Sequence, residues 1–195
     1  MPLLGLALAA RIPLLSPGDA SRTELDDATR REAQAVASVH RIFPEAALVR
    51  EHTIPLSASD KASLREMCKQ EWLEDSLHIF VAMASDSSLG YAVIDDVKGK
   101  DQFITYLVAV GRNLTVKDLE ILSYRESYGG EVRYKSWQKQ FYGKSADDNL
   151  RPGKEIKNIS GATISARSVT LGVRKILSLL QVVRDRLPRG SGVPR

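Results

Sequence analysis

The chain has 195 residues, of which 43% are hydrophobic and 27% charged, and its formal net charge is +4. This size and composition fit one domain with appendages or two very small domains. The charges are interspersed rather than blocked, which argues against a dedicated nucleic-acid surface. A single cysteine, Cys68, excludes an intrachain disulfide framework, and the three histidines are too scattered to supply the common zinc or iron sites.

The N-terminus begins with an apolar run. Residues 1–10 are small and aliphatic, like the hydrophobic region of a signal peptide that ends in an Ala-x-Ala site. The run is too short to span a bilayer. We therefore expect residues 1–20 to be a signal-peptide-like or disordered segment, with a linker-like stretch at 16–23, and we favour export over an ordinary unstructured terminus.

Residues 21–75 predict a helical N-terminal extension. The first helix is expected to end at Pro44, and a second one to open at Ser57 or Ser59. Apolar residues recur every three positions in the first helix, as on one face of a helix. These positions are Ala33, Val36, Val39 and Ile42.

From residue 77 the periodicity changes to that of strands, which predicts a hairpin followed by two further strands. A short helix is expected within 133–142, a polar loop at 144–154, a last helix at about 164–184 and a disordered tail at 185–195. We therefore predict an α+β fold with a mostly antiparallel sheet of about four to six strands, N-terminal helices and a C-terminal helix. The strand-like segments are residues 77–83, 89–95, 103–110 and 116–122.

The C-terminal helix begins at a motif with distinctive chemistry, Ser160-Gly161-Ala162-Thr163. A helix N-terminus presents free backbone N–H groups and the positive end of the helix dipole, which suits a phosphate group. Gly161 lets the backbone come close to such a group, and Ser160 could cap the helix or donate to a phosphate oxygen. Taken alone, the same four residues would more often be a plain helix cap.

Three further landmarks precede this motif in the chain, and together the four resemble the FMN-binding domain of the small subunits of Rnf and Na⁺-translocating NADH:quinone reductase complexes. The landmarks are the turn at 99–104, the loop at 124–130 similar to the family's Glu-Thr-Pro-Gly loop, and the Gln-Phe-x-Gly-Lys step at 140–144. The resemblance is to the exported, single-domain branch of that family, and it implies an FMN-binding domain at 76–184.

The resemblance implies that Thr163 carries FMN through a phosphoester bond made by an FMN transferase. That enzyme usually reads an acidic residue six positions before the threonine, where this chain has Lys157, so non-covalent FMN binding stays open. The diglycine of the second landmark permits a tight loop over a planar ring. The expected FMN-binding residues are Thr163, Ser160, Gly161, Ala162, Glu126, Ser127, Gly129, Gly130 and Lys100.

As a function, the resemblance implies an extracytoplasmic flavoprotein that carries electrons to or from a membrane redox protein. No Gly-x-Gly-x-x-Gly fingerprint for a nicotinamide cofactor is present, which favours a carrier over a self-contained reductase. Two alternatives stay open: a flavin-dependent reductase of a small substrate, and a ligand-binding or sensory module that keeps the fold without flavin.

Overall fold

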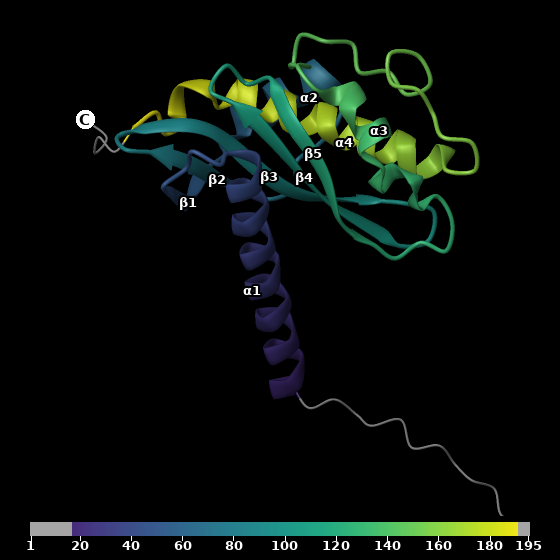
Figure 1. Ribbon diagram of the computed structural model, residues 1–195, viewed down its shortest axis with the longest axis horizontal. Coiled ribbons are helices and arrows are strands. Elements are labelled where there is room, and N and C mark those ends of the chain that lie inside the picture. The colour runs from purple at the N-terminus through teal and green to yellow at the C-terminus, as the bar shows by residue number, and fades with distance from the viewer. Residues whose placement is uncertain (1–16, 191–195) are drawn as a thin grey trace, which may run out of the picture. The chain divides into compact units, whose positions relative to one another are not determined.

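A five-stranded antiparallel sheet forms the centre of the protein, in a computed structural model that describes residues 17–190 (Figure 1). Each strand pairs with its neighbours in sequence, in the order β1-β2-β3-β4-β5. The predicted α+β class and antiparallel sheet are confirmed. The strands are β1 (Leu48–Pro55), β2 (Ser76–Ala84), β3 (Ser87–Lys98), β4 (Phe103–Gly111) and β5 (Val116–Tyr124).

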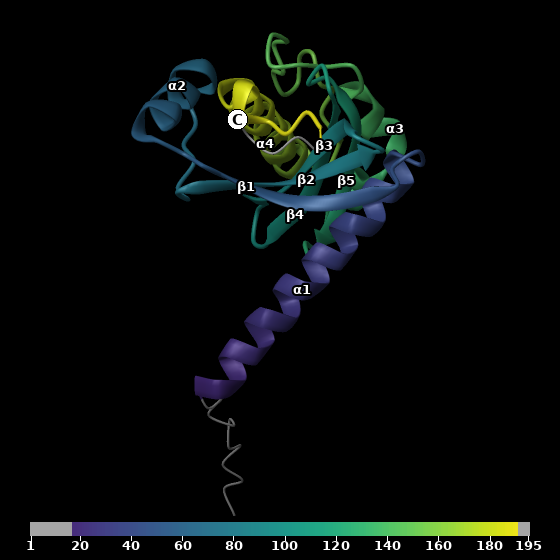
Figure 2. The ribbon, with the colours of Figure 1, turned by 90° about the vertical axis from the view of Figure 1, so that its left-hand side faces the viewer.

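Helices α2 (Ala58–Cys68) and α4 (Thr163–Val182) cover one face of the sheet (Figure 2). The main core lies between them and the strands, and α4 contributes an apolar face that includes Val169, Val173 and Ile176. β4 lies next to the β5 edge strand and is buried along most of its length, because helices cover it on both faces. Ser57 caps α2 in a capping box with Asp60. Of the two predicted start positions, Ser57 and Ser59, Ser57 is therefore the one that the structure confirms.

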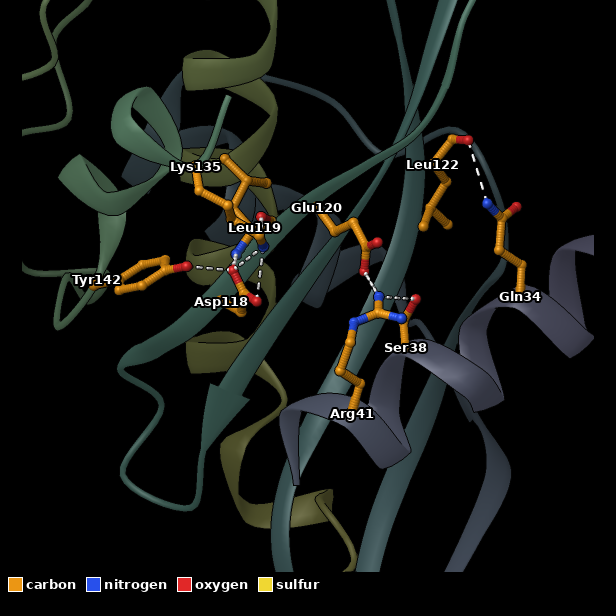
Figure 3. Close-up of polar contacts among 9 residues, drawn as sticks. All are labelled: Gln34, Ser38, Arg41, Asp118, Leu119, Glu120, Leu122, Lys135 and Tyr142. Carbon is orange, nitrogen blue, oxygen red and sulfur yellow. Dashed lines mark hydrogen bonds and ion pairs between the residues drawn. The ribbon is translucent and has the colours of Figure 1, made fainter. Parts of the chain in front are cut away.

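The other face of the sheet packs against the end of α1 (Pro17–Ile42). Ala35 and Val39 join Phe43 in a second, smaller core. Polar contacts reinforce this packing, since Arg41 pairs with Glu120 of β5 and the Gln34 amide donates to a β5 carbonyl (Figure 3). The chain divides into two compact units at Ala33/Gln34, and the described part of the first unit, residues 17–33, is helical throughout.

Three expectations from the sequence were wrong: the linker at 16–23, the purely helical extension at 21–75 and the disordered tail from residue 185. Residues 17–23 are helix rather than linker, because Pro17 stands at the first helical position, where proline's missing N–H costs nothing. The extension at 21–75 is not purely helical, since it contains β1. That strand is an edge strand with Ile54 as its only buried side chain, so it lacks the alternating apolar pattern by which strands are recognised.

The tail expected to be disordered from residue 185 is ordered as far as Gly190. Gly190 forms a bridge with Ser87, Leu187 is buried, and the Tyr91 hydroxyl donates to the Pro188 carbonyl at 2.8 Å. The signal-peptide-like run at 1–10 and residues 191–195 lie outside the described residues. Among residues 17–190, no helix has both the length and the apolar character needed to cross a bilayer.

Candidate functional site

The start of α4 is open to solvent and lacks a side-chain cap. Ala162 is the N-cap residue and makes no side-chain cap hydrogen bond, so the first backbone N–H groups of this 20-residue helix remain available for an anion. Ser160, Gly161 and Thr163 are exposed. Gly161 has φ +79°, and no atom lies within 4 Å of the position its Cβ would take, so a ligand can approach the backbone closely there.

The loop that follows β5 lies directly against this helix start. The Tyr124 hydroxyl donates to the carbonyl oxygen of Tyr128. Its single hydrogen is then used, so the Ser165 hydroxyl, 3.0 Å away on the first turn of α4, acts as donor to Tyr124. Gly129 completes the junction, because a Cβ there would lie 3.0 Å from the Cβ of Ala162. The structure thus brings the diglycine loop and the Ser-Gly-Ala-Thr motif together.

A solvent-open hollow of ≈ 360 Å³ lies in this loop and the turn after it. Its volume falls in the range of small-molecule sites, about 300–1,000 Å³. Tyr128 and Tyr134, both largely exposed, offer aromatic surface at the hollow. The hollow is lined by Tyr124, Glu126, Ser127, Tyr128, Gly129, Gly130, Glu131, Arg133 and Tyr134.

Glu126, one of the predicted FMN ligands, directs a carboxylate oxygen to the backbone of the β3–β4 turn. Oε1 accepts hydrogen bonds from the N–H groups of Asp101 at 2.9 Å and Gln102 at 3.0 Å. These backbone hydrogen bonds, that of Gln102 foremost, hold the pKa of Glu126 below its usual value. Glu126 therefore ties the turn that carries Lys100 to the loop that carries Ser127 and Gly129.

The extended segment before the motif is held by the Gln-Phe-x-Gly-Lys step. The Oε1 of Gln140 accepts from the N–H of Lys157 at 2.8 Å, and the indole N–H of Trp137 donates to the Lys157 carbonyl at 2.8 Å. The Lys157 side chain stays exposed. Glu155 cannot replace the missing acidic residue freely, because Arg151 binds its carboxylate and lowers its pKa to about 2.

Asp118 of β5 anchors the helical segment that carries Trp137 and Gln140, which includes α3 (Lys135–Gln138) (Figure 3). Its carboxylate binds the Lys135 ammonium at 2.7 and 2.8 Å and accepts from the Tyr142 hydroxyl at 2.6 Å. Burial raises the pKa of Tyr142, and the neighbouring Asp118 carboxylate raises it further. This contact fixes the distance between β5 and the segment that precedes the motif.

Sequence reasoning did not identify two groups at the site. One is Tyr124, whose hydroxyl joins the loop to α4. The other is Glu131, which lines the hollow and whose Oε2 is buried without a hydrogen-bond partner. Nothing in the spacing of the sequence marks either role. Among residues 17–190 no group of three or more metal-ligating side chains occurs.

Comparison with known proteins gives a consistent result. The model of a family described as the FMN-binding domain matches residues 99–178. One relative, from the proton-translocating ferredoxin:NAD(+) oxidoreductase complex of Clostridium ljungdahlii, is 30% identical over 114 residues, covering 55% of this chain and 58% of that protein. Another, from the Na(+)-translocating ferredoxin:NAD(+) oxidoreductase complex of Acetobacterium woodii, is 26% identical over 137 residues, covering 64% of this chain and 65% of that protein.

The chain therefore spans less than two thirds of the length of either relative. Among solved structures, NqrC of Shewanella oneidensis superposes with a TM-score of 0.53 at 16% sequence identity, covering 72% of this chain and 84% of that one. At this identity the likeness concerns the fold alone. The match to the family model confirms the resemblance read from the four landmarks.

Proposed function

Because residues 99–178 belong to the FMN-binding domain family, we propose that the protein is an extracytoplasmic electron carrier that holds FMN at the start of α4. The observation that carries the proposal is the junction of two segments: the uncapped helix start with its open Gly161 lies against the loop that forms the hollow. One segment suits a phosphate and the other a planar ring, as FMN requires.

The residues present fit the cofactor. The backbone N–H groups at the start of α4 and the Ser160 hydroxyl would hold the phosphate, and the loop with Ser127, Gly129 and Gly130 would hold the ring system. Bound FMN supplies the redox chemistry, by accepting and passing on one or two electrons. The protein supplies the anchor, the orientation and the charges around the ring.

Attachment would be covalent, through Thr163. In this linkage the Thr163 Oγ1 replaces a phosphate oxygen of FMN, so the protein gains the mass of FMN less one water. Thr163 suits this role because it is exposed at the first position of α4. An FMN transferase would make the bond, since among the described contacts of Thr163 no side chain activates the hydroxyl as a base would.

The proposed location and partners follow from features that lie beyond the FMN site. The apolar run at residues 1–10 favours export, and a covalent tether suits an exported protein, because a lost cofactor could not be replaced outside the cytoplasm. Both curated relatives are named as subunits of ion-translocating oxidoreductase complexes. A membrane redox protein is therefore the proposed electron donor or acceptor.

Intact mass and visible absorbance test the proposal. The protein is co-expressed with an FMN transferase as wild type, as Thr163→Ala, and as Thr53→Ala, which removes an exposed threonine from the edge strand β1. We expect the mass of one FMN less one water in the wild type and in Thr53→Ala, and its loss in Thr163→Ala. Equal flavin in all three proteins would reject the covalent link, and colourless wild-type protein that takes up no added FMN would reject the function.

A further inference from the structure

The second compact unit carries its charge unevenly along the chain. Of its described residues, 34–124 contain nine basic and 13 acidic side chains, whereas 125–190 contain 14 basic and six acidic ones. The formal charges of the two stretches are therefore −4 and +8. An asymmetry of this size indicates a charged partner where the surplus is exposed and is not neutralised within the fold.

Part of the surplus is neutralised inside the fold. In α4, Lys175 binds Asp95 of β3 at 2.9 Å, and beyond the end of α4 Arg186 binds Asp60 of α2 at 2.8 Å. Both pairs join a cation of the basic stretch to a carboxylate of the acidic one, so they cancel charge between the two stretches. The positive charge that remains lies on cations without such a partner.

Five exposed cations around the start of α4 have no such partner. Among residues 17–190, no ion pair or side-chain hydrogen bond engages any of them. The N–H of Lys157 donates to Oε1 of Gln140 at 2.8 Å, so Lys139 and Lys157 lie on neighbouring segments. Arg167 follows Thr163 by one helical turn and shares its side of α4. The five cations are Arg125, Lys139, Lys154, Lys157 and Arg167.

The carboxylates of the same stretch do not offset these five charges. Asp148 is bound by Lys144, and Glu155 is bound by Arg151. Within residues 125–167, Asp147 is then the one exposed carboxylate without an ion pair. The surface around the start of α4 is therefore positive, and it is interrupted by two ion pairs that are neutral as a whole.

We propose that these five cations form a docking surface for the acidic face of the redox protein that exchanges electrons with this one. The inference rests on the proposed function, because it takes the start of α4 as the place of the flavin. A positive surface around that place raises the encounter rate with an acidic partner and orients it.

Two observations favour a protein partner over an anionic membrane or a nucleic acid. Tyr128 and Tyr134 are 83% and 60% exposed beside the cations, and tyrosine is enriched in protein–protein interfaces. The two ion pairs within the surface break up the continuous run of cations that lipid headgroups and phosphate backbones select.

The test uses the flavin-loaded protein, with loading checked by intact mass, and two haem proteins as probes: the acidic cytochrome b5 and the basic cytochrome c. The flavin is reduced chemically, and stopped-flow absorbance follows its oxidation, in which two ferric haems take one electron each. From about 0.01 M to about 1 M ionic strength the Debye length falls from about 30 Å to about 3 Å. We expect the second-order rate constant for cytochrome b5 to fall about tenfold over this interval, and that for cytochrome c to rise.

A charge-matched pair of triple variants assigns the effect to the docking surface. Lys139→Gln/Lys154→Gln/Arg167→Gln removes three of its cations and spares Lys157, which stands where the transferase usually reads an acidic residue. The control removes three exposed cations from β1, the β4–β5 turn and the end of the chain's last helical turn, as Arg50→Gln/Arg112→Gln/Arg184→Gln. We expect the salt dependence with cytochrome b5 to shrink to about twofold in the first variant and to match the wild type in the control.

Calorimetric binding of cytochrome b5 to the flavin-free proteins gives a readout that needs no cofactor. At low ionic strength we expect binding to weaken about tenfold in the docking-surface variant alone. Equal salt dependence or equal binding in the two triple variants would overturn the inference and leave the proposed function intact. Binding to anionic vesicles or duplex DNA that persists at about 0.15 M salt would overturn the choice of a protein partner. Wild-type protein that takes up no flavin would instead reject the proposed function, and the inference with it.

Discussion

Gly129 is the position at which the loop after β5 comes closest to α4, and its replacement by alanine tests that junction. The new Cβ would lie 2.7 Å from the Tyr124 hydroxyl, 3.0 Å from the Ala162 Cβ and 3.2 Å from the Ala162 Cα. Gly129 also has φ +87°, which side chains disfavour. Gly143 offers a matched control, because it has φ +75° and open space where its Cβ would be.

The expected magnitudes follow from these two geometries. The positive φ costs about 1–2 kcal/mol in either variant. Only Gly129→Ala also forces atoms together, which costs about 1–3 kcal/mol in a packed site. The free energy of unfolding should therefore fall by about 1–3 kcal/mol more in Gly129→Ala than in Gly143→Ala, or by about 2–12 °C in Tm for a chain of this length.

Urea denaturation and thermal melting of the flavin-free proteins measure this difference. The same two variants are then co-expressed with the FMN transferase, and their visible spectra are compared. We expect Gly129→Ala alone to alter the flavin spectrum, because it pushes the loop away from the start of α4. Equal destabilisation of the two variants would refute the close approach of loop and helix on which the site depends.

Three further outcomes are expected. Lys157→Glu restores an acidic residue six positions before Thr163, so the flavinylated fraction in intact-mass spectra should rise, and an unchanged fraction would show that this position does not limit attachment. The pKa of Glu126 is depressed in the folded protein, so its ionised carboxylate contributes stability that is present above the unfolded pKa and lost as the pH falls through the lower folded pKa. Glu126→Gln should therefore flatten the decline of Tm below about pH 4.5. An equally steep decline of Tm in the wild type and in Glu126→Gln would contradict the role of Glu126 in holding the β3–β4 turn. Asp118→Asn should lower the pKa of Tyr142 in an ultraviolet titration, read against Tyr142→Phe, while burial keeps it above its usual value.

Local chemistry was sufficient to predict most elements of the fold. The strands at 103–110 and 116–122 and the helix from Thr163 were predicted within one or two residues, because the first is an almost continuous apolar run and the others carry apolar residues at strand or helix spacing. β1 was missed for the opposite reason: a strand at a sheet edge needs few buried side chains, since main-chain pairing with β2 holds it in place. The ordered tail depends likewise on a contact with the distant residue Tyr91.

The sequence alone implied the cofactor, because its four landmarks in order resemble those of the FMN-binding domain, and the family match confirmed FMN. Only the tertiary structure decided what the groups of the candidate site do. Glu126 braces a turn 25 residues away, the Tyr124 hydroxyl joins a loop to a helix 41 residues away, and Glu131 is left with a buried oxygen and no donor. Residue type and spacing record which groups a chain contains, whereas hydrogen bonding and desolvation depend on which of them folding brings together.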